Sequence, residues 1–282
     1  MSLEGGKYKI RKLQVHVVDH CNLSCAGCSH GSPFAPKKFY RWADYAPWVE
    51  QLSAYAYTTT IDLTGGECFL NPHLAELVKG FKQCVWKPIV CVATNAFWID
   101  NYDKYADVLT GIDTMFVTAH PPLGKTKADL NRLLAPIGKK YNFKFLVVAH
   151  DFVQISLRST PKKRTYCKFC PQLLANGQVA KCQIIAYQQW LPEMTKAFMT
   201  RSSQGLYDIT TGNYKTMYKW YTGGKYKNGL HKVCDYCDFN PGDDNWAHQD
   251  RHGHSPLTKS QKDIVKQKFI QIGEKRNKKR NK

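Results

Sequence analysis

Residues 13–28 read LQVHVVDHCNLSCAGC, an apolar stretch followed at once by three closely spaced cysteines, Cys21, Cys25 and Cys28. A structural zinc site usually takes four protein ligands, and an electron-transfer cluster takes four cysteines. Three thiolates in one short loop, with no fourth cysteine nearby in the sequence, instead suit a cubane [4Fe–4S] cluster whose fourth iron has no protein ligand. The loop therefore predicts a metal centre that binds a further ligand itself.

A second motif, Thr64-Gly65-Gly66-Glu67, closes the stretch 57–64 (YTTTIDLT), whose β-branched residues are typical of a strand. Paired glycines let a backbone approach a ligand closely because they have no side chain. The same pair is also common in ordinary turns. The cysteine loop in the same sequence favours the interpretation that this glycine pair contacts a ligand.

Both motifs fit one alternating architecture. Apolar or β-branched runs recur at 13–18, 58–63, 89–94, 114–118 and 143–148. The segments between them that are long enough for helices are 43–55, 73–82, 102–109 and 127–140. Strands that alternate with helices predict an α/β fold with a parallel sheet and right-handed crossovers. Ligands of such folds sit at the carboxyl ends of the strands, where both motifs occur.

These features resemble the radical S-adenosylmethionine (SAM) superfamily, whose CxxxCxxC loop is matched by residues 21–28 and whose GGE motif is matched by residues 65–67. The resemblance implies a partial (β/α)6 TIM-like barrel of the radical SAM type. It also implies that SAM chelates the open iron of the first [4Fe–4S] cluster. One electron, from a donor such as a flavodoxin or ferredoxin, then cleaves SAM to a 5′-deoxyadenosyl radical, which abstracts a hydrogen atom from the substrate.

The resemblance assigns cofactor-binding roles to residues at strand ends. Gly65 and Gly66, with Glu67 nearby, would hold the methionine ammonium group of SAM. Asn95 matches a position that often lies near the deoxyadenosyl group, and Thr118 matches one that often contacts the ribose or carboxylate of SAM. Polar residues at strand ends also cap helices, so the last two have an alternative structural role. No residue is assigned a catalytic role.

A second group of cysteines comprises Cys167, Cys170, Cys182, Cys234 and Cys237. The spacing from Cys167 to a glycine and on to Cys182 resembles the auxiliary-cluster region called SPASM, or its shorter relative Twitch. Five cysteines are too few for the full SPASM pattern. The resemblance therefore implies one auxiliary [4Fe–4S] cluster, held by Cys182, Cys234, Cys237 and either Cys167 or Cys170. The pairs 167/170 and 234/237 also have the spacing of a four-cysteine zinc site, and this alternative stays open.

The run CNLSCAGCSHGSP (21–33) and the segment CPQL (170–173) resemble a subgroup of the superfamily that carries a Twitch-like region. This likeness covers most of residues 11–240 and names no substrate. His30 in the first run would either donate a hydrogen bond to the cluster sulfurs or pack against the mouth of the barrel.

The chain has 282 residues and eleven cysteines. Such cysteine use indicates metal ligation in a reducing compartment, so we expect a cytoplasmic protein. Cys68, Cys84 and Cys91 are expected to be buried thiols. No run of 18 apolar residues occurs, so we expect no membrane association. The expected organisation is a flexible N-terminus (1–10), a radical SAM barrel (11–160), a small cysteine-rich auxiliary-cluster domain (161–240) and a basic C-terminal tail (241–282).

The net charge is +19, and the segment 257–282 holds ten basic residues against two acidic ones. The segment 209–233 has no acidic residue, and its lysines alternate with Tyr214, Tyr218, Trp220, Tyr221 and Tyr226. Basic side chains track phosphates and aromatic rings stack on bases, so the two segments predict an alternative nucleic-acid partner. A lysine-rich surface over an aromatic-packed domain explains the same pattern.

The sequence thus predicts a radical SAM enzyme, of oxidoreductase or isomerase type, with two clusters. Its substrate would be a sugar- or nucleotide-type small molecule that is oxidised or epimerised. One alternative is the modification of a nucleic-acid base. Another is a non-catalytic nucleic-acid-binding module that depends on zinc or a cluster.

We expect that replacing Cys21, Cys25 and Cys28 together by alanine abolishes reductive SAM cleavage, because no iron is then left to bind SAM. The second site should keep its metal, since its ligands lie elsewhere in the chain. Chromatographic measurement of 5′-deoxyadenosine under anaerobic, strongly reducing conditions checks this expectation. Formation at the wild-type rate would refute the assignment of the loop.

Overall fold

The computed structural model describes residues 6–25, 28–148, 160–161, 171–190, 202–223 and 231–237. Cys167, Cys170, Tyr226 and the expected tail at 241–282 lie outside these residues. The domain boundaries expected from the sequence therefore stay predictions.

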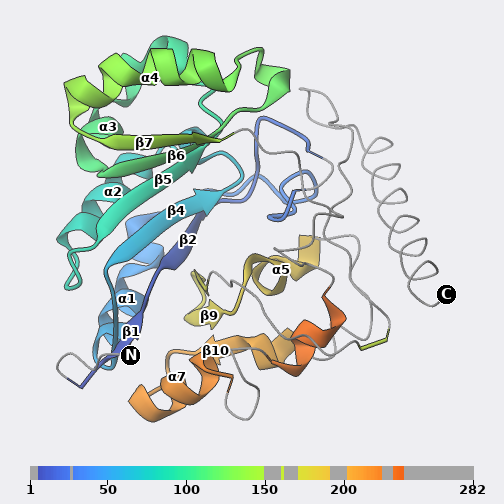
Figure 1. Cartoon of the computed structure of the whole chain (residues 1–282). Coiled ribbons are helices and arrows are strands. Elements are labelled where there is room, and N and C mark those ends of the chain that lie inside the picture. The colour runs from blue at the N-terminus through green and yellow to red at the C-terminus, as the bar shows by residue number, and fades with distance from the viewer. Residues whose placement is uncertain are drawn as a thin grey trace.

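A parallel sheet forms the centre of the molecule, and helices cover one of its faces (Figure 1). Five of its strands are, in spatial order, β2 (Leu13–Val18), β4 (Thr60–Gly65), β5 (Ile89–Thr94), β6 (Thr114–Thr118) and β7 (Lys144–Val148). The helices between them are α1 (Ala46–Ser53), α2 (Leu74–Gln83), α3 (Ala106–Gly111) and α4 (Lys127–Tyr141). The predicted α/β fold is confirmed. A sixth barrel strand would fall after β7, in a stretch mostly outside the described residues.

The structure divides two of the expected elements. The run 58–63 becomes β3 (Ala56–Thr58) and β4, and β3 pairs in parallel with β1 (Tyr8–Ile10) in a separate two-stranded sheet. The hydroxyl of Thr58 donates to the carbonyl of Thr60 at 2.9 Å, which bends the chain between the two strands. The helix expected at 102–109 is a 3₁₀ helix, η3 (Ile99–Tyr105), followed by α3, with a break in helical geometry at Asn101.

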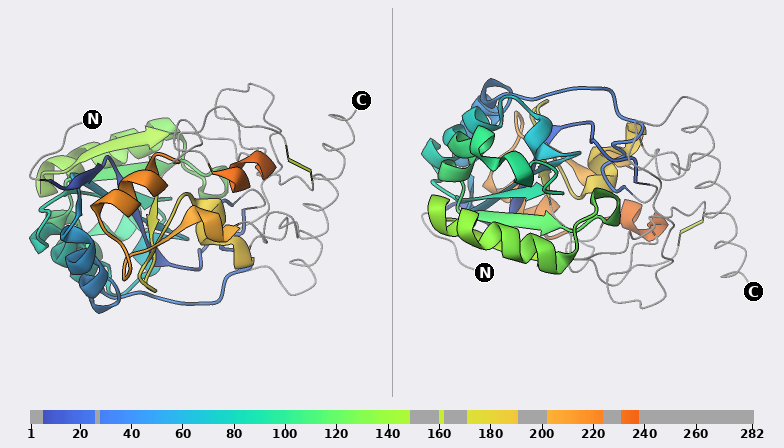
Figure 2. Two further views of the ribbon diagram at one scale, coloured as in Figure 1. Left: turned by 90° about the horizontal axis from the view of Figure 1, so that it is seen from below. Right: turned by 90° about the horizontal axis from the view of Figure 1, so that it is seen from above.

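The two faces of the sheet differ in chemistry. Val90 and Val92 of β5 are buried against the helices, together with Phe81 of α2, which is 0% exposed. Figure 2 shows from two further sides how the helices cover this face. The opposite, inner face carries Asp62 and Cys91, which are direct partners in the register of β4 and β5. Cys91 is partly exposed there, so the expectation of a buried thiol is wrong for Cys91, whereas Cys68 and Cys84 are buried.

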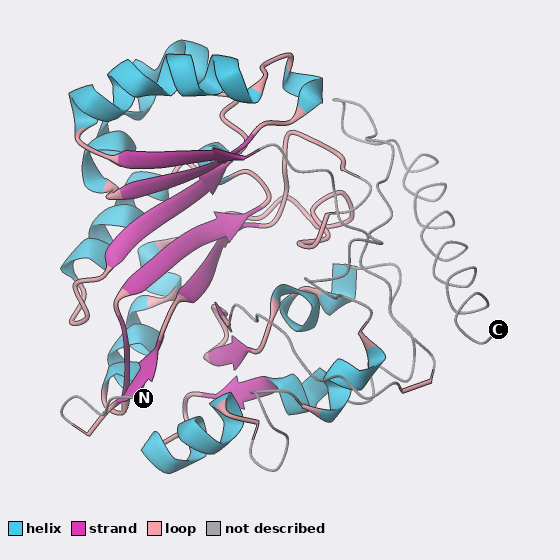
Figure 3. Cartoon of the chain, viewed as in Figure 1, coloured by secondary structure: helices cyan, strands magenta, loops and turns pink. Residues whose placement is uncertain are grey.

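The C-terminal part of the described chain continues the same sheet (Figure 3). β8 (Gln172–Leu173) pairs in parallel with β2, and β9 (Gln178–Ala180) and β10 (Leu206–Asp208) follow in antiparallel order. The short helix η6 (Ser203–Gly205) precedes β10, whereas η1 (Trp42–Asp44), η2 (Cys68–Leu70) and η4 (Pro121–Leu123) lie between the strands of the N-terminal half. The remaining helices are α5 (Gln183–Ala186), η5 (Gln188–Trp190), α7 (Tyr214–Tyr221) and η8 (Lys232–Tyr236). The result is one eight-stranded sheet that joins the barrel strands to the second group of cysteines.

The described residues contain no helix that is both long and apolar enough to cross a bilayer.

We expect Phe81→Ala to lower the free energy of unfolding by about 3–5 kcal/mol, because it leaves a cavity between α2, Trp42 and Tyr45. Urea denaturation followed by circular dichroism measures this change. Val85→Ala is the matched control, since Val85 is 63% exposed, and it should change stability by less than about 0.5 kcal/mol. Equal effects of the two changes would contradict the packing described for α2.

Candidate functional site

The cysteine loop follows β2 at the carboxyl edge of the sheet. Cys25 is buried, whereas Cys21 and Cys28 are partly exposed, and the amide of Cys28 donates to the carbonyl of Cys25 at 3.3 Å. Burial, and then the charge of nearby Glu67, raise the pKa of the Cys21 thiol well above its ordinary value. A thiolate at this position therefore needs a bound metal to stabilise it.

The three thiols are a donor set that fits iron, because thiolates are the ligands that iron–sulfur clusters prefer. Within the described ranges, no three His, Cys, Asp or Glu side chains stand in an arrangement that could hold a metal ion. Ligation by Cys21, Cys25 and Cys28 therefore stays a prediction that rests on the motif.

The glycine pair packs directly against the start of the cysteine loop. The amide of Gly66 donates to the carbonyl of Val18 at 2.9 Å, and the amide of Glu67 donates to the carbonyl of His20 at 3.2 Å. A methyl group on Gly66 would collide with the carbonyl oxygen of His20 and lie 2.8 Å from the amide nitrogen of Cys21. Gly65 has φ +148°, and a methyl group there would collide with the carbonyl of Val18. Both glycines are thus required by backbone contact with the loop.

The side chain of Glu67 points into the protein and is 1% exposed. One carboxylate oxygen accepts hydrogen bonds from the Phe69 amide at 3.1 Å and from the Thr94 hydroxyl at 2.7 Å, and the other accepts from the Asn95 amide at 2.7 Å. Burial raises the pKa of Glu67 to about 7, although these hydrogen bonds oppose the shift. The Glu67 carboxylate is thus already bonded within the protein. Because an ammonium group only donates hydrogen bonds, the methionine ammonium group of SAM would instead bind carbonyl oxygens of the Gly65–Gly66 turn.

Asn95 lies beside Cys21 at the end of β5. Its side-chain nitrogen is 3.8 Å from the Cys21 Sγ and 2.8 Å from the Asn22 Oδ1. Thr118, at the end of β6, is partly exposed at the same edge of the sheet. The structure therefore brings Gly65, Gly66, Glu67 and Asn95 together around the cysteine loop, with Thr118 two strands away from β4.

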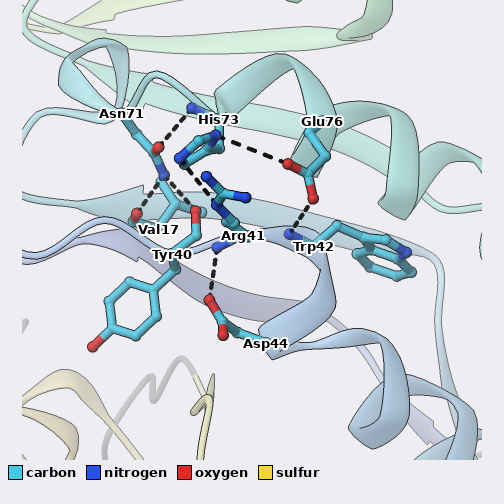
Figure 4. A network of polar contacts seen from close by, with 8 residues as sticks. All are labelled: Val17, Tyr40, Arg41, Trp42, Asp44, Asn71, His73 and Glu76. Atoms are coloured by element: carbon cyan, nitrogen blue, oxygen red, sulfur yellow. Dashed lines mark hydrogen bonds and ion pairs between the residues drawn. The ribbon is translucent and has the colours of Figure 1, made fainter.

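A polar network anchors the chain where it returns from the cysteine loop (Figure 4). Buried Asn71 donates to the carbonyl of Val17 at 2.7 Å and to the carbonyl of Tyr40 at 2.8 Å. Arg41 donates to His73 at 3.1 Å, which ties the same segment to the start of α2. Asn71 was not identified from the sequence, because a buried asparagine that bridges two distant carbonyls leaves no spacing pattern.

His30 is partly buried and lies between other rings beside β2. Its ring centroid lies 5.7 Å from that of His16 and 5.5 Å from that of Tyr187. Burial lowers the pKa of His30 to about 3, so its ring is neutral. These contacts favour the expectation that His30 packs against the mouth of the barrel.

Three of the second group of cysteines lie around one small hydrophobic cluster. Cys182 directly precedes α5, and Cys234 and Cys237 lie in and after η8. All three pack against a cluster that includes Ile184, Tyr187 and Val233. The three cysteines thus border the same hydrophobic cluster.

The segments that follow the two groups of cysteines contact each other. The hydroxyl of Ser29, which follows Cys28, donates to the side chain of Gln183 at 2.8 Å, and Gln183 follows Cys182. A methyl group on Gly31 would lie 2.9 Å from the Cβ of Trp190. The segment after the cysteine loop thus lies against the helices that follow Cys182, a contact that nothing in the sequence indicated.

We expect Gly66→Ala to lower both the iron bound at the first site and the affinity for SAM, because the methyl group pushes His20 and Cys21 away from β4. Iron analysis and equilibrium binding measure the two effects. Gly124→Ala is the control for backbone strain at a glycine elsewhere, since Gly124 has φ +67° and, among the described residues, no atom lies within 4 Å of its added methyl group. Unchanged iron and SAM binding in Gly66→Ala would show that the turn has only a local structural role.

No family model matches the chain. A curated relative, the probable GTP 3′,8-cyclase of Methanocaldococcus jannaschii, is 23% identical over 167 residues, which are 57% of this chain and 56% of the cyclase. The match thus spans little more than half the length of that relative.

Among solved structures, BtrN in complex with AdoMet (SAM) and 2-DOIA has a TM-score of 0.50 and 19% sequence identity, over 82% of this chain and 94% of BtrN. Streptococcus suis SuiB bound to S-adenosylmethionine has a TM-score of 0.39 and 14% identity, over 51% of this chain and 34% of SuiB.

The likeness to BtrN shows the fold. The curated relative and BtrN are radical SAM enzymes. This chain carries the CxxxCxxC loop and the GGE motif of that superfamily in contact with each other at the carboxyl edge of such a sheet. In these motifs and in its fold, the chain is therefore similar to the radical SAM superfamily.

Proposed function

We propose that this protein is a radical SAM enzyme that cleaves SAM reductively and abstracts a hydrogen atom from a sugar- or nucleotide-type small molecule. The observation that carries the proposal is the contact of Gly66 and Glu67 with His20 and Cys21, which joins the two motifs into one site. The outcome would be an oxidation or an epimerisation. The protein would act in the cytoplasm with a flavodoxin or ferredoxin as electron donor.

Each group of residues at the site would have its own role in binding the cluster or SAM. Cys21, Cys25 and Cys28 would hold the [4Fe–4S] cluster, which when bound supplies the electron that cleaves SAM to a 5′-deoxyadenosyl radical. The Gly65–Gly66 turn would accept hydrogen bonds from the methionine ammonium group through carbonyl oxygens. Thr118 would face the ribose or carboxylate of SAM from β6.

The inner face of the sheet favours a polar small molecule as substrate. Asp62 lies there with Cys91 and Thr114 in one row across three strands, and its carboxylate pairs with Lys12 at 2.7 Å. Such groups can bind hydroxyl or amine substituents of a sugar or nucleotide. BtrN, whose solved complex holds AdoMet and 2-DOIA, matches over nearly its whole length, which adds support for a small-molecule substrate.

Cys182, Cys234 and Cys237, with Cys167 or Cys170, would hold the auxiliary [4Fe–4S] cluster. That cluster would accept an electron from a substrate radical or anchor the substrate. The hydrogen bond from Ser29 to Gln183 supports cooperation between the two sites, because it joins the residues that follow Cys28 and Cys182.

Nucleic-acid modification is the second candidate, but the aromatic residues of α7 give it little support. The Trp220 ring lies 5.4 Å from the Tyr207 ring, and the Tyr221 ring lies 5.0 Å from the Tyr8 ring, so both pack against the protein. Tyr218, which is 44% exposed, and the exposed lysines of α7 remain available for a partner. The non-catalytic zinc or cluster module stays the third candidate.

We expect the reconstituted protein to hold about eight irons per chain, as two [4Fe–4S] clusters require, and to form 5′-deoxyadenosine from SAM with a strong reductant. Metal analysis and chromatography measure both quantities. About four irons with one zinc would indicate a zinc second site and keep the SAM chemistry. Zinc alone, without SAM cleavage, would end the radical SAM proposal in favour of the binding module.

Fluorescence anisotropy with labelled DNA and RNA over a salt series separates the two substrate classes. A nucleic-acid enzyme should lose affinity with log salt at a slope of about 0.9 per phosphate contact on duplexes. Lys215→Ala with Lys219→Ala should then reduce that slope, whereas Lys87→Ala serves as the control away from α7. Binding of neither nucleic acid at low salt is the outcome expected for a small-molecule substrate.

A further inference from the structure

We infer that Asn95 is a positioning residue that holds Cys21 through an N–H···S hydrogen bond, that Glu67 holds the backbone of Asn95 in place, and that the Asn95 donor raises the reduction potential of the first cluster. The inference rests on the proposed cluster at Cys21, Cys25 and Cys28. It gives Asn95 a role other than the contact with the deoxyadenosyl group that the motif implies.

The orientation of the Asn95 amide is set by its neighbours. The side-chain oxygen accepts from the amide of Phe97 at 3.0 Å, so the nitrogen must face the other way. That nitrogen donates one hydrogen to the Asn22 Oδ1 at 2.8 Å and faces the Cys21 Sγ at 3.8 Å with the other. Asn95 is 5% exposed, and its oxygen and both N–H groups are engaged within the protein. Little of the side chain is left to contact SAM.

Glu67 fixes the backbone that carries this amide. Its carboxylate accepts from the Asn95 amide at 2.7 Å and from the Thr94 hydroxyl at 2.7 Å, and Thr94 in turn accepts from the indole of Trp98 at 3.0 Å. Because Glu67 also donates its own amide to the carbonyl of His20, one residue connects the end of β5 to the residue before Cys21.

Hydrogen bonds to a ligating sulfur withdraw electron density from the cluster and stabilise its reduced, more negative form. Cys21 has two such donors, because the amide of Leu23 also lies 3.4 Å from its Sγ. The Leu23 donor belongs to the backbone and stays in any side-chain variant. The Asn95 donor can therefore be removed alone.

The test compares Asn95→Ala, Asn95→Asp and Glu67→Gln in the reconstituted full-length protein by an EPR-monitored redox titration. Asn95→Ala and Asn95→Asp should shift the potential of the first cluster to more negative values, so that the ratio of reduced to oxidised cluster at a fixed poise falls severalfold. Asn95→Asp should shift it furthest, because it replaces the donor by a negative charge. Glu67→Gln presents an NH₂ group to the Asn95 amide but also removes a negative charge near Cys21, so its potential should lie above that of Asn95→Ala.

Asn131→Ala is the control, because the exposed Asn131 bonds only within α4, to the Lys127 carbonyl. It should leave the potential unchanged. The rate of Cys21 alkylation in the metal-free chain, mapped by mass spectrometry, is the second readout and should rise in Asn95→Ala. This readout does not depend on cluster loading.

An unchanged potential in all three variants, with SAM affinity lowered in Asn95→Ala, would overturn the inference and place Asn95 on SAM instead. If Asn95→Ala does not fold, Asn95→Asp decides the question by the same titration. If the wild-type protein binds no iron at the first site, the proposed function itself is wrong. That outcome differs from a cluster that is present but whose reduction potential does not change in these variants.

Discussion

The close contact between two stretches of backbone, Gly65–Glu67 and Val18–Cys21, is the constraint on which the site depends. Any side chain at Gly65 or Gly66 would collide with the carbonyl groups that lead into the cysteine loop. The place of Cys21 relative to β4 is therefore set by main-chain packing. Side chains at the site then adjust a geometry that the glycines have already imposed.

A buried carboxylate extends this constraint to the next strand. Leaving Glu67 unpaired in the interior would be costly, and its three hydrogen bonds from Phe69, Thr94 and Asn95 offset much of that cost. The same bonds draw the end of β5 toward the cysteine loop. Asn71 has a similar role on the other side of the loop, where its side chain bonds both Val17 at the end of β2 and Tyr40 in the segment after the loop. The cysteine loop is thus fixed by contacts with three parts of the chain: the end of β2 before it, the end of β5 beside it, and the segment at Tyr40 after it.

The sequence predicted those parts of the fold that rest on local patterns. The strands at 89–94 and 114–118 were predicted with their observed bounds, because β-branched runs between turn residues have a clear period. β8, with two residues, is too short to show any period, and its pairing with β2 joins residues far apart in the chain. The motifs identified Gly65, Gly66, Glu67 and Asn95. They could not show that Glu67 turns toward β5 or that Asn95 faces Cys21, because side-chain direction follows from tertiary packing.

The central claim is that the iron left without a protein ligand binds SAM beside the Gly65–Gly66 turn. The EPR spectrum of the dithionite-reduced protein, recorded with and without SAM, tests this claim most directly. A cluster with an open iron should give a signal that changes shape and position when SAM is added, and the signal of any auxiliary cluster should stay the same. Identical spectra with and without SAM, in a protein whose first site is loaded with iron, would contradict the account.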